Sequence, residues 1–413
     1  MKQYPTYKES GLVNIETIPA HWEALKLRLV CDQIFTGNTP VYAYEPNEFL
    51  VFGQRNNQKN CIDFAGIKYA DPEFFAARTE NEFLRYGDVL LNTLGGGSVG
   101  RIGFYDVKDK QVITDGHVMI LRGNKSVEQK YLYYFLHSQQ SLLEEAAVGS
   151  TNQAFLTTTQ MFQWKVAVPP LAEQQAIAKF LDSKTAKIDE TFSLYEQQKA
   201  DLVEYRKALI SDTVTRGLNP NAKLKDSGIQ WLGQIPETWQ VNRLKLLFTL
   251  HRGYDLANEE FVDGGIPVYG SSGFMGYHNE VKATAPNVVI GRSGSVGKLH
   301  YVEEDFWAHN TGIYISDTKG NVVKYLYYLL SAIDIAALST QTAVPTLDRK
   351  KVQDTMFPFT TDAEEQQAIV SFLDSKTAMI DEAIYRIDEQ IADLKAYRTA
   401  LITEAVTGKI DVR

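Results

Sequence analysis

The sequence contains little cysteine, no long apolar run and no excess of positive charge. Its two cysteines, Cys31 and Cys61, are too few for a disulfide framework or for a metal site with four thiolates. No run of eighteen apolar residues occurs, and the polar N-terminal residues lack the apolar segment of a signal peptide. We therefore expect a cytoplasmic protein, and its 413 residues are enough for two or more domains.

The lack of positive net charge does not by itself exclude DNA binding. A net charge of −9 argues against a nucleic-acid-binding protein, but binding depends on where the charges lie rather than on their sum. Most of the excess acidic residues lie in two segments, 173–215 and 365–407. The rest of the chain is close to neutral, so DNA binding stays open.

Patterns that indicate catalysis are also missing. The histidines are scattered without a cysteine pair, and no G-x-S-x-G string occurs. The string GGGSVG at 95–100 matches G-x-G-x-x-G, but the residues after it predict a strand where a dinucleotide site requires a helix. In the matching second loop, Arg292 breaks this pattern, and Leu299 after Lys298 excludes a P-loop. We predict a non-catalytic chain in which both glycine loops are tight turns between strands.

The sequence does contain a long internal repeat. Residues 173–215 match 365–407 without a gap and share the strings EQQAI, FLDSKTA and IDE. Fainter repeats precede them in the same order: IPAHW answers IPETW, GSVG occurs twice, and YLYYFL answers YLYYLL. Such a duplication predicts four consecutive parts: a variable domain at 1–170, a repeat at 171–218, a second variable domain at 219–361 and a second repeat at 362–413.

Each strong repeat is predicted to be a long helix, and the two are predicted to pair as a coiled coil. Neither segment contains glycine or proline, and apolar residues recur every seven positions. These positions are Leu181, Ile188, Tyr195, Leu202 and Leu209 in the first repeat, and Leu373, Ile380, Ile387, Leu394 and Leu401 in the second.

The variable domains are predicted to be α+β. Short β-like runs are separated by glycine, asparagine, proline and aspartate. One helix is expected at 126–147, with Ser126 and Gln129 as a capping box, and another at about 321–337.

The identity of FLDSKTA in both repeats suggests a docking surface for two copies of one partner. Two helices that only pair with each other are free to diverge. We therefore hypothesise that the polar residues of this string contact the partner: Asp182, Ser183 and Lys184, with Asp374, Ser375 and Lys376.

Polar residues in the loops of the variable domains are candidates for contacts with DNA. Arginine and lysine hydrogen-bond guanine, and asparagine and glutamine hydrogen-bond adenine, in the major groove. The candidates are Gln54, Arg55, Asn56, Asn57, Lys59, Arg101, Asn152 and Gln153 in the first domain, and Arg252, Tyr254, Tyr269, Ser271, Ser272, Arg292, Lys298, His309 and Asn310 in the second. Arg292 is the strongest candidate for a base contact, because a glycine turn places it in a loop that recurs in both halves.

On these features the chain resembles the specificity subunit of a type I restriction-modification system. The resemblance covers the whole chain and rests on the domain order, the I-P-x-x-W openings, the G-D-V-L-L…G-x-V-G loop and the E-Q-Q-A-I…F-L-D helix starts. It implies two target recognition domains joined by two antiparallel helices with pseudo-twofold symmetry. It also implies two methyltransferase (modification) subunits that use S-adenosylmethionine, and restriction subunits that use ATP and Mg. No cofactor is expected in this chain.

The expected target is double-stranded DNA with two different half-sites and an unread spacer whose length the helices set. A specificity subunit of a type IIB-like system and a coiled-coil scaffold that does not bind DNA remain alternatives. The second half departs from the first at two points. Pro286-Asn287 stands where the first domain has Gly87-Asp88, and FPFTTDAEE replaces PPLAE before the second helix.

Overall fold

The chain forms two compact units, each built from segments that are distant in the sequence. The computed structural model describes residues 2–58, 61–149, 154–230, 232–340 and 345–413. Unit 1 comprises Met1–Leu194 and Gln390–Arg413, and unit 2 comprises Tyr195–Glu389. Each unit therefore contains one variable domain and a part of each long helix.

The two long helices are α6, Leu171–Arg216, and α9, Ala363–Val406. Helix α6 begins directly after Pro169-Pro170, and α9 begins after Asp362, whose carboxylate accepts hydrogen bonds from the backbone N–H groups of Glu364 and Glu365. Gly217 follows α6 with a positive φ of 71°, the conformation that commonly ends a helix. At about 1.5 Å per residue, each helix is roughly 65–70 Å long.

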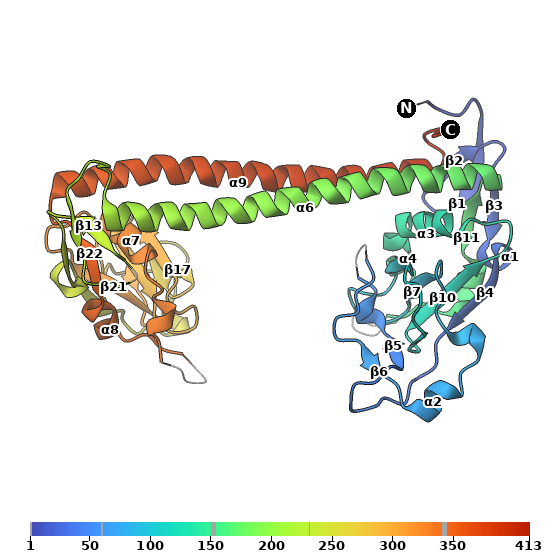
Figure 1. Ribbon diagram of the computed structural model, residues 1–413, viewed down its shortest axis with the longest axis horizontal. Helices are drawn as coiled ribbons and strands as arrows, with labels where there is room; N and C mark the ends of the chain where they lie inside the picture. The colour runs from blue at the N-terminus through green and yellow to red at the C-terminus, as the bar shows by residue number, and fades with distance from the viewer. Residues whose placement is uncertain (1, 59–60, 150–153, 231, 341–344) are drawn as a thin grey trace. The chain divides into compact units, whose positions relative to one another are not determined.

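Salt bridges place the helices side by side and antiparallel, as Figure 1 shows for α6 in green and α9 in red. In unit 2, Lys199 pairs with Asp388 at 2.5 Å and Arg206 with Asp381 at 2.9 Å, so the chain numbers rise on one helix as they fall on the other. In unit 1, Arg398 pairs with Asp189 at 3.1 Å in the same register. The Asp189–Arg398 and Asp381–Arg206 pairs join repeat-equivalent residues.

The positions that recur every seven residues face inward. Six of them are buried: Leu181, Ile188, Leu373, Ile380, Ile387 and Leu401. The other four, Tyr195, Leu202, Leu209 and Leu394, are half-buried. The apolar seam of the helix pair is therefore the one that the repeat spacing indicates.

Both variable domains contain a four-stranded antiparallel sheet of the same topology. In unit 1 the order is β4-β10-β7-β8, and in unit 2 it is β15-β21-β18-β19. The bounds are Cys31–Thr36, Val118–Gly123, Val89–Asn92 and Ile102–Phe104 in unit 1, and Thr249–Arg252, Gly312–Asp317, Asn287–Gly291 and Leu299–Val302 in unit 2.

The smaller ladders are repeated too. The sheets β6-β5-β9 (Lys68–Tyr69, Leu50–Phe52, Val112–Thr114) and β17-β16-β20 (Gly273–His278, Ile266–Gly270, Trp307–Ala308) each include one parallel pair. Strand β3 (Glu23–Lys26) pairs with β11 (Lys165–Val168), as β14 (Gln240–Arg243) does with β22 (Met356–Phe359). Strand β1 (Tyr7–Leu12) pairs with β2 (Ile15–Pro19), as β12 (Leu224–Asp226) does with β13 (Gln234–Pro236).

Short helices complete the domains, and the predicted fold class is confirmed. They are α1 Leu27–Val30, α2 Pro72–Ala76, α3 Gln129–Ser138, α4 Gln140–Glu145, α5 Thr158–Gln163, α7 Val323–Ser331 and α8 Arg349–Asp354. Within the described residues, 3-10 turns lie at Gln54–Asn56, Glu80–Glu82, Leu244–Leu246, Asn258–Glu260 and Ala336–Leu338. Among the helices described, none is long and apolar enough to cross a bilayer.

The predicted capping box at Ser126 and Gln129 is wrong. Helix α3 begins at Gln129, and its N-cap Glu128 makes no side-chain cap. The Gln129 side chain instead accepts from the backbone N–H of Gly123 at 2.7 Å and donates to the carbonyl of Gly87 at 3.0 Å. Sequence spacing cannot reveal this competing use of the amide, because Gly87 is distant along the chain.

We expect the apolar seam to carry much of the stability of unit 1. Replacing Leu181, which is fully buried in the main core of unit 1, with alanine should lower the free energy of unfolding by about 2–5 kcal/mol. The same substitution at Leu194, which is 64% exposed on the same helix, should change it by less than about 0.5 kcal/mol. Denaturant unfolding of both variants checks this, and equal losses would contradict it.

Candidate nucleic-acid interface

A carboxylate at the start of each long helix, buried in unit 1 and half-buried in unit 2, accepts a hydrogen bond from the tryptophan of the repeated I-P-x-x-W string in the same unit. In unit 1, Trp22 Nε1 donates to Glu173 Oε1 at 3.0 Å, and the Tyr4 hydroxyl donates to the same oxygen at 2.5 Å. In unit 2, Trp239 Nε1 donates to Glu365 Oε1 at 2.9 Å. Removing a carboxylate from water is costly unless it is hydrogen-bonded, most of all for the buried Glu173. Each tryptophan therefore fixes the start of its domain against the long helix.

The next residue of each helix, a fully buried glutamine, holds the helix that contains the YLYY string. Gln174 accepts from the backbone N–H of Glu128 at 2.9 Å, next to the start of α3. Gln366 accepts from the backbone N–H of Val322 at 2.9 Å, next to the start of α7. The amide groups also donate to carbonyl oxygens of the entry segments, of Pro169 at 2.8 Å and of Thr360 at 2.9 Å.

The aspartate of FLDSKTA forms a third contact between the long helix and the variable domain of the same unit. We call the three contacts together the joint. Asp182 accepts from Lys130 Nζ at 2.9 Å and from the Tyr134 hydroxyl at 2.8 Å, both on α3. Burial raises the pKa of the Tyr134 hydroxyl, as does the carboxylate, so it stays protonated and donates at neutral pH.

Unit 2 repeats the contact of Asp182. Asp374 accepts from the Tyr328 hydroxyl at 2.6 Å and lies 3.0 Å from Lys324 Nζ, both on α7. The tyrosines also approach Thr185 and Thr377 of the same strings, at 3.2 and 3.3 Å.

These contacts revise the hypothesis that Asp182 and Asp374 of FLDSKTA contact a partner protein. Asp182 and Asp374 have partners within the chain, so their repetition does not require a second protein. Lys184 and Lys376 are exposed and remain candidates for partner contacts, together with the two serines of the string. The repeated strings IPxxW, YLYY, EQQ and FLDSKTA are thus one set of residues in mutual contact.

Both glycine loops are turns between antiparallel strands, as predicted. They join β7 to β8 in unit 1 and β18 to β19 in unit 2. The last glycine of each loop has a positive φ and lies close to another backbone. A Cβ built on Gly100 would lie 2.9 Å from the nitrogen of Glu144, and one on Gly297 would lie 2.8 Å from the nitrogen of Ala336. Glycine is therefore required at these points by space and by backbone conformation.

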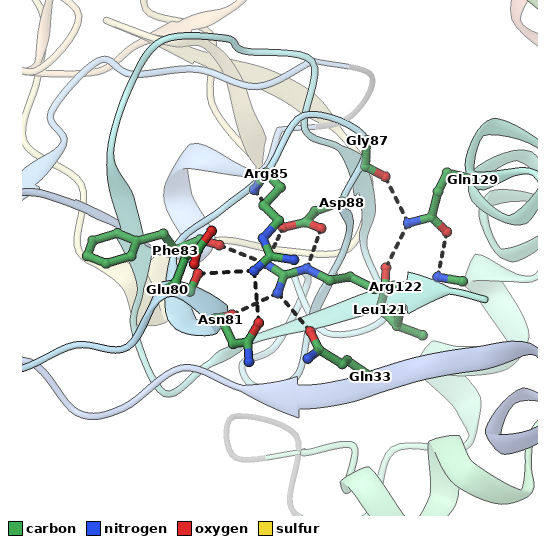
Figure 2. Close-up of polar contacts among 11 residues, drawn as sticks. Gln33, Glu80, Asn81, Phe83, Arg85, Gly87, Asp88, Leu121, Arg122 and Gln129 are labelled. Atoms are coloured by element: carbon green, nitrogen blue, oxygen red, sulfur yellow. Dashed lines mark hydrogen bonds and ion pairs between the residues drawn. The ribbon is translucent and has the colours of Figure 1, made fainter. Parts of the chain in front are cut away.

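A buried ion pair in unit 1 joins β10 to the residue before β7, at the end of these strands away from the glycine loop (Figure 2). Arg122 on β10 donates from Nε to Asp88 Oδ1 at 2.7 Å and from Nη2 to Asp88 Oδ2 at 2.8 Å, a bidentate pair. The guanidinium also donates to Gln33 Oε1 and to the carbonyls of Asn81 and Phe83. This arginine is 8% exposed, so it stabilises the fold and cannot reach DNA.

Unit 2 lacks this ion pair, which accounts for the departure at Pro286-Asn287. Asn287 takes the place of Asp88, and the strand register places Ser316 where unit 1 has Arg122. The Asn287 amide accepts from the backbone N–H of Ile315 at 3.2 Å and donates to its carbonyl at 3.0 Å. A neutral amide replaces the carboxylate because its charged partner is absent.

The candidate DNA contacts of unit 1 divide into exposed and structural residues. Arg55 is exposed and Gln54 is half-buried, so both remain candidates. Asn56 and Asn57 are buried, at 1% and 0% exposure, which corrects the prediction that they contact DNA. The Asn57 amide donates to Asn92 Oδ1 and Asn56 donates to the carbonyl of Asp63, so both residues shape the loop.

Arg101 is half-buried, and its guanidinium donates to the carbonyls of Asn57 and Gly97, at 3.1 Å each. It therefore holds the glycine loop against the loop that contains Asn57. Lys59, Asn152 and Gln153 lie outside the described residues.

In unit 2, several candidates are accessible. Arg252, Tyr254, Ser272 and Lys298 are exposed, whereas Tyr269, Arg292 and Asn310 are half-buried.

Two further candidates of unit 2 are buried, which corrects the prediction that they contact DNA. Ser271 and His309 are each 8% exposed. Burial lowers the pKa of His309, so it is neutral at neutral pH, and its Nδ1 lies 2.8 Å from the Thr311 hydroxyl.

Sequence reasoning missed Arg349, the first residue of α8. It lines a cleft together with Arg252 and Arg292. The sequence offers one signal for Arg349. LTT at 156–158 and LDR at 347–349 share a leucine and occupy the same place in the two halves, after the segments GSTNQAF and LSTQTAV.

Removing one joint carboxylate should loosen its domain from its helix. Asp374→Ala should lower the stability of unit 2 by about 1–2 kcal/mol, because the pair with Lys324 is partly screened by solvent while the Tyr328 hydroxyl is largely buried. Ser375→Ala, at the exposed neighbouring position, is the matched control and should have little effect. Hydrogen exchange of α7 measures the loosening, and unchanged protection would contradict the role of the joint.

Comparisons with known proteins agree with this architecture. The family profile described as type I restriction modification DNA specificity domain matches residues 19–202 and 236–392. A putative type I restriction enzyme MjaX specificity subunit of Methanocaldococcus jannaschii is 25% identical over 58% of this chain. The match spans 56% of that relative, so this chain spans about half of its length. The type I restriction enzyme EcoBI specificity subunit of Escherichia coli is 22% identical over 68% of this chain and 66% of its own length.

Solved structures share the fold. A chain from a study of complex assembly and conformational transition of the type I R-M system aligns over 95% of this chain and 99% of its own length, with a TM-score of 0.73 and 16% identity. The HsdS subunit from Thermoanaerobacter tengcongensis aligns over 97% of this chain and 100% of its own length, with a TM-score of 0.55 and 16% identity. The profile matches one block in each half and covers more than half of the residues, so the chain belongs to the type I restriction-modification DNA specificity family.

Proposed function

We propose that this chain is the DNA-recognition subunit of a type I restriction-modification complex and that it reads a bipartite, asymmetric target. The observation that carries this proposal is the repetition of one domain topology on one joint, with different residues in the loops. A repeated fold reads the same kind of ligand, and different loop residues read different base pairs. Each unit would read one half-site.

The helix pair would set the length of the unread spacer. Its two halves have the same antiparallel register, and the joint at each helix start holds a domain in place. A rigid connection between readers makes the spacing of the half-sites a property of helix length.

The methyltransferase and restriction activities would belong to partner subunits. Two modification subunits would dock on the helices, one near the exposed Ser183 and Lys184 and one near the exposed Ser375 and Lys376. These subunits would bind S-adenosylmethionine. Restriction subunits would bind ATP and Mg. This chain would contribute no catalytic group, and the complex would act in the cytoplasm, where the DNA lies.

Shortening both helices by one heptad should shorten the spacer and preserve both half-sites. Deleting 199–205 together with 382–388 removes segments that face each other, including the Lys199–Asp388 pair, and keeps Arg206 opposite Asp381. Seven residues correspond to about 10 Å of helix, or up to about three base pairs of DNA. Methylome sequencing of cells that carry the variant measures the motif. Deletion of 199–205 alone is the control, because it misaligns the pair and should abolish modification. A changed half-site would contradict the proposal that helix length sets only the length of the spacer.

Tight DNA binding should require the partner subunits. Acidic residues are concentrated on the helices, and the recognition domains are close to neutral, so this chain alone lacks the positive surface that DNA affinity depends on. We expect the isolated chain to bind a target duplex at least about 100-fold more weakly than its complex with the modification subunits, by fluorescence anisotropy at the same salt concentration. Nanomolar, sequence-specific binding by the isolated chain would contradict this expectation.

A further inference from the structure

Three arginines from separate elements of unit 2 line one surface cleft. Arg252 ends β15, Arg292 directly follows β18, and Arg349 begins α8. The cleft has a volume of about 290 Å³, and its other lining residues are Ile313, Thr340, Thr346, Leu347 and Asp348.

Each guanidinium is held by a contact within the chain. Arg349 Nη1 donates to the carbonyl of Leu250 at 3.1 Å, and Arg292 Nη1 donates to the carbonyl of Asn310 at 3.2 Å. Arg252 Nη2 lies 3.2 Å from Asp255 Oδ1. A guanidinium has five N–H donors, so one such contact orients the group and leaves further donors for a ligand.

The cleft is positively charged even when its acidic neighbours are included. Asp348 is the carboxylate that lines it, and its Oδ1 accepts from the backbone N–H of Lys350 at 2.9 Å. Asp255 offsets part of the charge of Arg252 from outside the lining. Three guanidinium groups against one lining carboxylate favour an anionic ligand.

Unit 1 has threonine at all three equivalent positions. The backbone N–H of Leu347 donates to the backbone carbonyl of Arg292, and in the same way the backbone N–H of Leu156 donates to the backbone carbonyl of Thr93. Arg292 and Thr93 are therefore equivalent. Arg349 is the second residue after Leu347, and Thr158 is the second residue after Leu156.

The third equivalence follows from the first strand of each sheet. The glycine after Arg252 donates to the carbonyl of Gly312 on the neighbouring strand, as the glycine after Thr36 donates to that of Val118. The charge of the cleft therefore belongs to unit 2 and not to the shared fold.

We propose that this arginine cleft of unit 2 binds a backbone phosphate of the DNA, and that unit 2 therefore makes a larger ionic contribution to binding than unit 1. A cleft receives a group that projects from its ligand, and phosphates project from a duplex, whereas base edges lie inside its grooves. This assignment rests on the proposed function and replaces the base contact hypothesised for Arg292. Arg252, Arg292 and Arg349 would set the position of the second half-site, and neighbouring exposed residues would read its bases.

The salt dependence of DNA binding tests this assignment directly. Binding of the full complex to its target duplex and to a scrambled duplex is measured between about 50 and about 200 mM salt, with the wild type and the triple variant Arg252→Gln, Arg292→Gln, Arg349→Gln. The three arginines share one phosphate, so the triple variant, which loses that contact, should reduce the slope of log K against log salt concentration by about 0.9, on both duplexes alike. Arg386→Gln, an exposed charge of unit 2 on α9, is the matched control and should leave the slope unchanged.

A lysine variant separates a phosphate contact from a base contact. Arg292→Lys keeps the charge and loses the bidentate fork, so a phosphate site keeps the salt slope and the target preference. If the triple variant does not fold, the single variant Arg252→Gln at an exposed side chain gives the same test with a slope change that is smaller than about 0.9 and equal on both duplexes. An unchanged slope, or a loss confined to the target duplex, would overturn the assignment. A wild-type complex without target preference would instead refute the proposed function.

Discussion

The structure depends on a carboxylate at the start of each long helix, the buried Glu173 in unit 1 and the half-buried Glu365 in unit 2. Each binds the indole N–H of the tryptophan that opens its domain, and the adjacent glutamine holds the helix that contains YLYY. Buried polar groups of this kind are costly when unpaired, so the domain and the helix are stable only together. A mobile joint would not hold a recognition domain at a defined distance from the other domain. A joint made of three successive contacts can do so.

This joint explains why some parts of the sequence are repeated and others are not. Residues that contact one another across the joint recur in both halves, because a change in one leaves its partner unpaired. The Asp88–Arg122 pair lies outside the joint, and unit 2 replaces both of its residues together. Loop positions such as Thr93 and Arg292 share a backbone geometry but differ in chemistry, as expected where each unit meets its own DNA.

The long helices, their apolar seam and the strand turns at the glycine loops could be predicted from local patterns, since heptads and glycine spacing act over short distances. Side-chain partners that are distant in the sequence could not. Gln129 matches a capping box but is drawn to Gly87, and Asn57 appears solvated in a polar run but is buried against Asn92. The same limit hid the pairing of Asp182 with Lys130 and the approach of Arg349 to Arg252 and Arg292.

Recognition of DNA by two units on one helix pair is most directly tested by mapping adenine methylation in cells with and without the gene for this chain. The account predicts that loss of the gene removes one methylated motif, made of two different half-sites around an unread spacer, and that the intact gene restores it. Restoration of the same motif by a chain that lacks unit 2, or an unchanged set of motifs after deletion, would contradict the account.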